Sequence, residues 1–264
     1  MSLTRTAFAL LALSLAQAAA ACSRELRVGI SELGYGVYLN DGQWQGIVPD
    51  LVAELSQRSG CQLRLVSRPR ARLLMEFDQG QLDIVTTAVR TAERDRVGWF
   101  LPYSYAVQDL IVVGDPIPLS LEELRRLPDA RLGLVRGVRL GRRLNEQVSA
   151  MLTSHQAEYS PDFDNLAARL AAGRLKAALI PNVIYAKLKD DRKLPARVTT
   201  VRLAESQLEP LGLYVNRRHV SEEDLQQVAH HLEALKHDGR MVAAYLRHVG
   251  EIETRRLSPK GAGR

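Results

Sequence analysis

Aromatic residues and cysteines are scarce in this chain, and the scarcity narrows what the protein can do. Aromatic residues make up 5% of the 264 residues, so a broad stacking surface for single-stranded nucleic acid is not expected. The sequence contains neither a Gly-x-Ser-x-Gly nucleophile motif nor a Walker phosphate-binding loop. Apolar residues account for 46% of the chain, which supports a substantial core in one large domain or two small lobes.

Basic residues exceed acidic ones, giving a formal net charge of +6, but most of them are scattered along the chain. The exceptions are the run Arg68, Arg70 and Arg72 and the pair Arg255 and Arg256. Scattered charge is typical of a solvated surface rather than of a nucleic-acid footprint. We therefore expect no nucleic-acid partner.

The histidines do not form a convincing metal site. His230 and His231 are adjacent, and His237 and His248 follow nearby. Adjacent histidines on a helix point to different faces, and no cysteine or carboxylate completes a ligand set. We expect neither a metal nor another cofactor.

The first 21 residues form a hydrophobic leader. Arg5 precedes an apolar core of about ten residues, and an alanine-rich stretch follows it. That core is too short to span a bilayer. We interpret residues 1–21 as a cleaved signal peptide, which places the mature protein outside the cytoplasm.

The two cysteines, Cys22 and Cys61, each precede a predicted strand. If the two strands are parallel neighbours, their starts are close enough for a disulfide, which an oxidising compartment favours. The alternative is a lipid-modified cysteine at position 22. The three alanines before it lack the large aliphatic residue that such a signal usually has.

Strand patterns alternate with helix patterns along most of the chain. Strands are predicted at 26–30, 62–66, 82–87, 110–114, 131–135, 177–180 and 211–215, and helices at 49–60, 70–79, 121–127, 139–152, 165–172, 221–239 and 242–249. Thr91 is expected to cap one further helix. Residues 251–264 are polar and basic, and we expect them to be disordered.

Several short stretches occur in the order typical of one family. They include Leu26-Arg-Val-Gly-Ile30, Asp41-Gly-Gln-Trp-Gln-Gly46, Gly80-Gln-Leu-Asp-Ile-Val85, Thr91-Ala-Glu-Arg94, Gly173-Arg-Leu-Lys-Ala-Ala178 and Leu235-Lys-His-Asp-Gly239. Over about residues 25–250 the chain resembles the type-3 family of bacterial extracellular solute-binding proteins, the receptors of polar amino-acid importers. No single stretch is specific, but their number and order are.

The resemblance implies an α/β fold of the periplasmic binding protein-like type II, with two α/β lobes and a ligand cleft between them. By analogy lobe 1 comprises residues 22–104 plus 212–264, and lobe 2 comprises residues 105–211. Two crossover strands join the lobes, which close on the ligand by hinge bending. A monomer is expected.

The resemblance also names binding residues. Arg94 corresponds to the arginine that clamps the ligand carboxylate, for which a planar guanidinium offers two parallel donors. Thr86 and Thr87 correspond to the small polar residues that supply hydroxyl and backbone contacts. Tyr35 and Tyr38 lie where the family often places an aromatic wall.

Other positions depart from the family pattern. In the stretch 69–72, Arg70 replaces a tryptophan and Arg72 completes the motif, while Arg136 lies in the turn before a helix that is a natural anion site. These arginines either surround the cleft or are ordinary surface residues. Asn182 occupies the position where amino-acid binders usually carry the aspartate that pairs with the α-ammonium group. The combination favours a ligand with a carboxylate and no strict need for an ammonium group.

The resemblance therefore predicts a periplasmic solute-binding protein that passes a small polar, carboxylate-bearing solute, such as an amino acid, to the membrane permease of an ABC transporter or to a sensor. One alternative is an orphan sensory or structural descendant of the fold. A second is a dehydratase-type enzyme, for which Glu205 or Glu209 would supply the acid. We expect no enzymatic activity.

Overall fold

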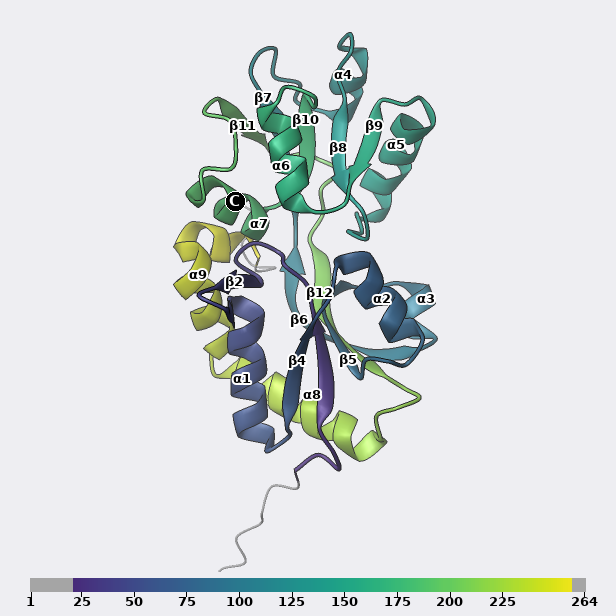
Figure 1. The fold of residues 1–264 in the computed structure, drawn as a ribbon, viewed down its shortest axis with the longest axis vertical. Helices are drawn as coiled ribbons and strands as arrows, with labels where there is room; N and C mark the ends of the chain where they lie inside the picture. Colours follow the sequence, from purple (N-terminus) through teal and green to yellow (C-terminus); the bar gives the residue numbers. More distant parts are fainter. Residues whose placement is uncertain (1–20, 258–264) are drawn as a thin grey trace, which may run out of the picture.

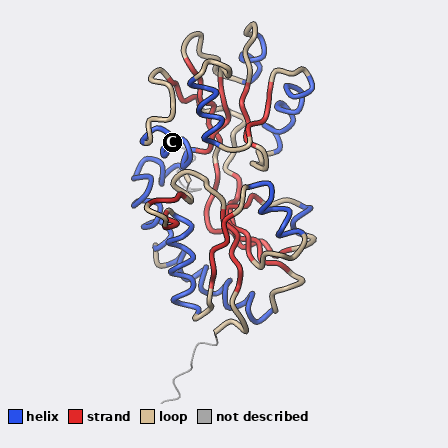
Figure 2. Tube along the Cα trace, viewed as in Figure 1, coloured by secondary structure: helices blue, strands red, loops and turns tan. Residues whose placement is uncertain are grey.

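The computed structural model describes residues 21–257, and the predicted signal peptide lies outside the described residues except for Ala21. The chain forms two lobes, one above the other in Figure 1, and each is built around a five-stranded sheet. Figure 2 shows the strands in the middle of each lobe with helices on the outside. Within residues 21–257, no helix is both long and apolar enough to cross a membrane.

The first lobe contains a mixed sheet with the strand order β4-β1-β5-β12-β6. Its strands are β1 (Leu26–Ile30), β4 (Leu63–Ser67), β5 (Ile84–Val89), β6 (Gly98–Ala106) and β12 (Glu209–Asn216). β1 runs parallel to β4 and β5, whereas β12 is antiparallel to β5 and β6. The carboxyl ends of β1, β4 and β5 therefore meet at one edge, which faces the second lobe (Figure 1).

Helices cover both faces of this sheet. The elements are α1 (Ile47–Ser59), α2 (Arg70–Asp78), α3 (Ala92–Asp95), α8 (Glu222–His237) and α9 (Arg240–Arg256), with a small hairpin of β2 (Tyr38–Asn40) and β3 (Gln43–Gln45). α1, α8 and α9 pack together and share an apolar cluster with β1. α2 covers the other face, where Leu73 and Phe77 pack on Val85 and Tyr214.

The second lobe has the strand order β11-β7-β10-β8-β9. Its elements are β7 (Gln108–Val113), α4 (Leu121–Arg126), β8 (Leu132–Val135), α5 (Arg142–Thr153), β9 (Ala157–Ser160), α6 (Phe163–Ala171), β10 (Ala177–Pro181), α7 (Asn182–Asp190) and β11 (Val198–Val201). Two apolar clusters fill the two sides of this sheet, and residues such as Leu110 and Ile111 at its centre are fully buried. The lobe thus has a core of its own.

Two connections join the lobes. Only Val107 separates β6 of the first sheet from β7 of the second, and residues 202–208 lead back from β11 to β12. The boundaries expected from the sequence, 104/105 and 211/212, fall inside β6 and β12, which pair with each other in the first sheet. Both lobes are therefore tied to one central pair of long strands.

The local start and stop signals of the sequence appear at the ends of several helices. The side chain of Thr91 accepts a hydrogen bond from the backbone N–H of Arg94 at the start of α3, and that of Ser221 accepts one from Asp224 at the start of α8. Gly60, with φ 70°, ends α1 in the left-handed conformation that favours glycine. These short-range interactions fix the positions of the residues that follow.

The expectation of a disordered tail is wrong for Glu251–Arg256, which continue α9 beyond a kink at Gly250. Arg256 Nη2 donates to both carboxylate oxygens of Asp109 in the second lobe, at 2.7 and 2.8 Å. Leu257 is buried in the core of the first lobe. Tertiary contacts order a segment whose polar composition predicts disorder, and that segment links the two lobes.

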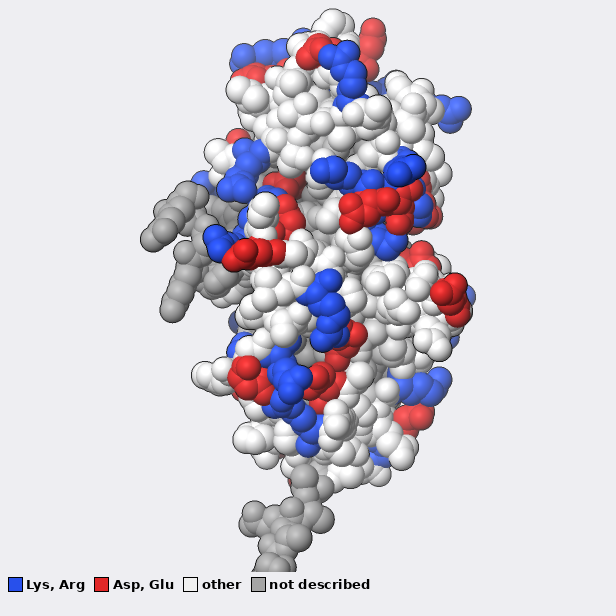
Figure 3. All heavy atoms as spheres, turned by 90° about the vertical axis from the view of Figure 1, so that its left-hand side faces the viewer, with Lys and Arg blue, Asp and Glu red and all other residues white. Residues whose placement is uncertain are grey.

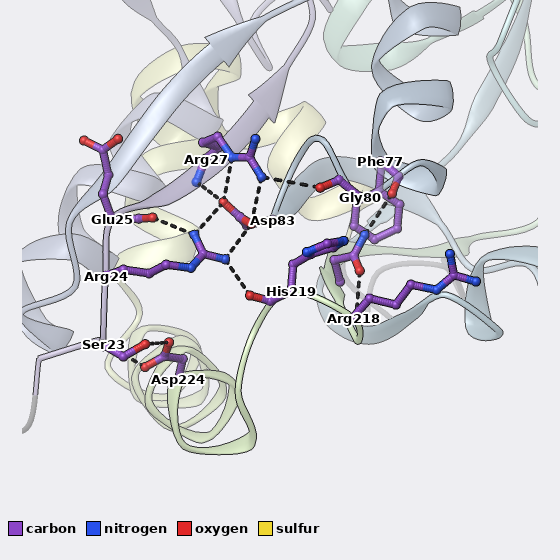
Figure 4. Close-up of polar contacts among 11 residues, drawn as sticks. Ser23, Arg24, Glu25, Arg27, Phe77, Gly80, Asp83, Arg218, His219 and Asp224 are labelled. Atoms are coloured by element: carbon purple, nitrogen blue, oxygen red, sulfur yellow. Dashed lines mark hydrogen bonds and ion pairs between the residues drawn. The ribbon is translucent and has the colours of Figure 1, made fainter.

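At the amino ends of β1, β4 and β5, a second set of contacts holds the start of the chain (Figure 4). Cys22 and Cys61 form a disulfide, as the sequence predicts. Asp83 is fully buried and accepts hydrogen bonds from the side chains of Arg24 and Arg27 at 2.8–3.2 Å. These interactions hold the pKa of Asp83 well below its usual range, against the opposing effect of burial.

Charges of both signs are intermixed on the surface. On the face drawn in Figure 3, acidic and basic side chains lie next to one another. Arg247 pairs with Asp50 at 2.5 Å, and Arg58 pairs with Asp238 at 2.6 Å. On this face the basic residues are distributed among acidic partners.

Candidate functional site

A cavity of about 70 Å³ lies between the lobes, at the carboxyl ends of the parallel strands of the first sheet. Residues from both lobes and from α9 line it: Leu33, Arg70, Thr87, Val89, Arg94, Tyr105, Ala106, Gln108, Val138, Arg139, Pro181, Asn182, Val183, Ile184, Leu211 and Tyr245. None of these described residues is acidic. The cavity thus combines apolar walls with three arginines, at the position where ligands bind in open α/β sheets.

A wider cavity of about 640 Å³ adjoins the first one. The two share Leu33, Arg70, Val138 and Ile184. The wider cavity is lined by side chains of both charges from both lobes. Arg70 therefore lies where an inner, acid-free chamber opens into an outer, mixed one.

Arg94 lines the inner chamber and is 7% exposed. The Thr91 cap fixes its backbone, and its Nη1 donates to the carbonyl oxygen of Val89 at 3.0 Å. No carboxylate oxygen of residues 21–257 lies within 4.0 Å of its guanidinium, so it has no ion-pair partner there. Burial, followed by the nearby charge of Arg139, lowers the pKa of Arg94. Arg139 itself pairs with Glu93 at 3.1 Å.

Arg70 is the first residue of α2, where Pro69 directs the chain out of β4. Its guanidinium donates to the carbonyl oxygens of Thr86 at 3.2 Å and Thr87 at 2.7 Å. Like Arg94, it has no ion-pair partner within the described part of the chain. Burial lowers the pKa of Arg70 to about 10, and the charge of Arg94 acts in the same direction. It still carries its charge at neutral pH.

Two neutral polar groups of the inner chamber also lack partners. Thr87 Oγ1 and Gln108 Oε1 are buried and have no hydrogen-bond partner among residues 21–257. Thr87 has φ 56°, an uncommon value for a β-branched residue. The hydroxyl of Thr86, unlike that of Thr87, has a partner, because it donates to the carbonyl oxygen of Gly29. Thr86 does not line the cavity. Buried polar groups without partners are rare, so the two found in residues that line this cavity call for an explanation.

Asn182 is 2% exposed and lines the inner chamber. Its Nδ2 donates to Glu253 Oε2 at 2.7 Å. The same oxygen accepts from Arg256 Nη1 at 2.9 Å. The nearest carboxylate is thus already paired and lies behind the amide, outside the cavity lining.

The two predicted tyrosines occupy different positions. Tyr38 lines the outer chamber, whereas Tyr35 lines neither chamber. The hydroxyl of Tyr35 donates to Asp190 of α7 at 2.5 Å and thereby connects the lobes. The Nζ of Lys187 lies over both rings, 5.8 Å from the ring centre of Tyr35 and 5.0 Å from that of Tyr38.

The structure does not bring Arg72 and Arg136 into either chamber. Arg72 donates to Glu76 at 2.6 Å, one turn along α2. Arg136 is exposed and lies 5.9 Å from the ring centre of Tyr159. Both residues have ordinary surface environments, which leaves Arg70 as the arginine of this group that lines the cavity.

Gln108 and Tyr245 line the inner chamber without any sequence signal that predicts it. Gln108 begins β7, directly after the first crossing, and Tyr245 comes from α9 near the other end of the chain. The single hint is that Gln108 and Asp109 are polar residues at the start of a strand that is otherwise apolar. Their positions depend on how the lobes meet.

The acids considered for an enzyme lie elsewhere. Glu205 accepts a hydrogen bond from Gln147 at 3.2 Å, and Glu209 lies against Gly141. Neither residue lines the chambers. Between residues 21 and 257, no three or more His, Cys, Asp or Glu side chains gather as a metal site.

The sequence comparison confirms the resemblance. The sequence model of the bacterial extracellular solute-binding proteins, family 3, matches residues 26–251. A search of curated proteins found no match to this chain.

Solved structures with the same fold are numerous. An ancestral arginine-binding protein bound to glutamine is 24% identical, with a TM-score of 0.71 over 86% of this chain and 98% of that one. A histidine kinase sensor domain similar to periplasmic binding proteins is 17% identical, with a TM-score of 0.72 over 86% and 96%. The arginine-, lysine-, histidine-binding protein ArtJ from Geobacillus stearothermophilus is 16% identical, with a TM-score of 0.71 over 86% and 96%. These likenesses confirm the predicted fold class, the two-lobed periplasmic binding protein type II fold.

Proposed function

We propose that this chain, which belongs to family 3 of the bacterial extracellular solute-binding proteins, captures a small carboxylate-bearing solute in the periplasm and delivers it to the membrane permease of an ABC transporter. Arg94 binds the solute carboxylate in the inner chamber, and the lobes close around it. The protein acts by binding and carries out no reaction, in keeping with the positions of Glu205 and Glu209 outside the chambers.

The observation that carries this proposal is the state of Arg94. It is 7% exposed, lines the chamber, and has no carboxylate within 4.0 Å in the described range 21–257. A buried cation without a counter-charge is costly, and a ligand carboxylate that accepts two parallel N–H bonds would offset that cost. Because no acidic residue lines the chamber, the solute supplies the negative charge that neutralises Arg94.

The proposed compartment follows from the hydrophobic leader and the disulfide between Cys22 and Cys61, which an oxidising environment favours. A sensory role is the second candidate. It is favoured by the fold likeness to a histidine kinase sensor domain, with a TM-score of 0.72. Both roles depend on the same binding of solute. They differ in whether a membrane permease or a sensor protein recognises the closed, solute-bound form.

The first prediction tests the carboxylate clamp. A thermal-shift screen of amino acids, dicarboxylates and amines identifies the best solute, since a ligand of the folded state raises its stability. Titration calorimetry with that solute should then show about ten- to a hundredfold weaker binding by Arg94→Ala, because a charge-assisted contact contributes about 1.5–3 kcal/mol. Arg94→Lys should recover little, since a point charge does not replace the planar guanidinium.

Arg90→Ala is the matched control. Arg90 lies four residues from Arg94, is exposed, and pairs with Asp95 at 3.0 Å outside both chambers. The Arg90→Ala variant should bind the solute with wild-type affinity. Wild-type affinity in Arg94→Ala, or a plain cation as the best solute, would contradict the proposed function.

A further inference from the structure

Two unpaired guanidinium groups share the inner chamber, one more than the carboxylate clamp requires. Arg70 comes from α2 and Arg94 from α3, and each donates only to backbone carbonyl oxygens. No Asp or Glu oxygen of the described chain lies within 4.0 Å of either group. The resemblance gives a tryptophan at this position in some members of the family, where this chain has Arg70.

The acidic residues nearest to this pair are engaged or more distant. Glu93 pairs with Arg139 at 3.1 Å. Asp78 and Glu93 both favour the charged form of Arg94 through space, but neither forms an ion pair with it. Carbonyl dipoles offset part of the charge of Arg70, and no residue that lines the inner chamber supplies a full negative charge. The outer chamber, which Arg70 also lines, does contain acidic residues. The inner chamber therefore holds an excess of positive charge.

A position for an ammonium group is missing on the opposite wall. Asn182 presents an amide where a carboxylate would be needed, and its Nδ2 is already bound to Glu253. The charge of Glu253 is paired with Arg256, which also binds Asp109. An ammonium group in this chamber would face arginines without a carboxylate partner, which is unfavourable.

We infer that the solute is a small dicarboxylate without an ammonium group, with one carboxylate on Arg94 and the other on Arg70. The inference rests on the proposed function and specifies its solute. Arg94 lines only the inner chamber, whereas Arg70 lines both chambers at their junction. A solute with two separated carboxylates reaches both guanidinium groups along this path. The Thr87 hydroxyl lines the same chamber, has no partner within residues 21–257, and can donate a hydrogen bond to a carboxylate oxygen.

A single carboxylate satisfies this chamber less well. It neutralises one guanidinium group and leaves the other without a counter-charge in the chamber lining. A zwitterionic amino acid adds a positive charge and makes the balance worse. Inorganic sulfate carries the same double negative charge but is compact, so it serves to distinguish two separated carboxylates from any dianion.

The second prediction tests this pairing by titration calorimetry of the full mature protein. The probes are succinate and its longer α,ω-dicarboxylate homologues, butyrate as a monocarboxylate, aspartate as the ammonium-bearing counterpart of succinate, and sulfate. We expect the best dicarboxylate to bind at least about tenfold more tightly than butyrate, aspartate or sulfate. Arg70→Met should weaken dicarboxylate binding by about ten- to a hundredfold and butyrate binding by less than about threefold.

Arg90→Met is the control for the loss of an arginine, and thermal melts of all variants show whether they fold. If Arg70→Met does not fold, Arg70→Lys tests the same point and should keep dicarboxylate binding at a weaker level. An amino acid that binds best, through Arg94 and without dependence on Arg70, would overturn the dicarboxylate inference and leave the proposed function intact. Sulfate binding as tightly as the best dicarboxylate would also overturn it. Absence of any binding solute would overturn both.

Discussion

The two ends of the first sheet use the same chemistry in opposite ways. At the amino ends of β1 and β5, the carboxylate of Asp83 is fully buried and receives the guanidinium groups of Arg24 and Arg27. At the carboxyl ends, Arg70 and Arg94 lie in a chamber whose described lining contains no carboxylate. At the amino ends, which we call the closed end, the buried charge has ion-pair partners. At the carboxyl ends, which we call the open end, Arg70 and Arg94 have none within residues 21–257.

The difference shows which end of the sheet serves stability and which serves a ligand. Hydrogen bonds and charges from the two arginines lower the pKa of Asp83, so its charged form favours the folded state. Burial lowers the pKa of Arg70 to about 10, so its charged form disfavours the folded state. Arg70 and Arg94 at the open end need a negative charge that the chamber lining does not supply, so it must come from a ligand. Substitutions at the two ends should therefore affect stability and binding separately.

The third prediction concerns the disulfide at the closed end and has the largest expected effect on stability. Cys22 and Cys61 are 39 residues apart, and the chain-entropy model gives about 3–4 kcal/mol for a loop of this length. Urea unfolding of the double variant Cys22→Ser, Cys61→Ser should show that loss. Under conditions where the double variant is fully folded, its affinity for the solute should stay within about twofold of the wild-type value, because the disulfide lies at the end of the sheet away from the chambers.

The unreduced and reduced wild-type proteins are the controls, and intact mass with alkylation reports the state of the thiols. Reduction alone should reproduce the loss seen in the double variant. Equal unfolding free energies with and without the bond would show that the closed end does not depend on it. A lipid adduct on Cys22 would contradict the bond itself.

The fourth prediction removes the carboxylate of the closed end. Asp83→Asn should destabilise the protein by about 2–3 kcal/mol, below the usual range for breaking a buried pair because the partner arginines reach solvent. Their side chains are 43% and 36% exposed. The measurement is the free energy of unfolding in urea at pH 7, with Glu25→Gln as a control, because Glu25 forms an exposed pair with Arg64.

The pH profile gives this prediction a second readout. The pKa of Asp83 is lowered in the folded state, so its stabilisation is present above the ordinary aspartate pKa of about 4 and is lost as the pH falls below it. The difference in stability between wild type and Asp83→Asn should therefore shrink as the pH is lowered below about 4. A difference independent of pH would mean that the charge of Asp83 is not what stabilises this end.

The sequence predicts the disulfide of the closed end from two cysteines that each precede a strand, and the family resemblance identifies Arg94 as the clamp. The contacts of Asp83 with Arg24 and Arg27 join residues 59 and 56 positions apart and were not predicted. The cap at Thr91 sets the backbone of Arg94 three residues later, and glycine and serine signals mark the helix ends. The order of strands and helices follows from periodicity in the same way. The strands β6, β9 and β11 and the helix α7 escaped prediction, since their short or mixed patterns become regular only through pairing and packing across the fold.

The rest of the site depends on contacts between distant segments. Asn182 and Glu253 are 71 residues apart, and Arg256 and Asp109 are 147 apart. No local pattern indicates that the amide of Asn182 is held by the last turn of α9. The resemblance shows that the aspartate usual in amino-acid binders is absent here, and the structure shows that the nearby carboxylate of Glu253 is already paired with Asn182 and Arg256.

The fifth prediction, with the smallest effect, tests the open end without ligand. Arg70→Met removes a partly buried charge together with two hydrogen bonds to the carbonyl oxygens of Thr86 and Thr87. Relief of burial and loss of the bonds oppose each other, so the free energy of unfolding at pH 7 should be unchanged or rise by up to about 1 kcal/mol. A loss as large as that of Asp83→Asn would show that Arg70 already has a stabilising role in the fold, and that the two ends of the sheet are not opposites.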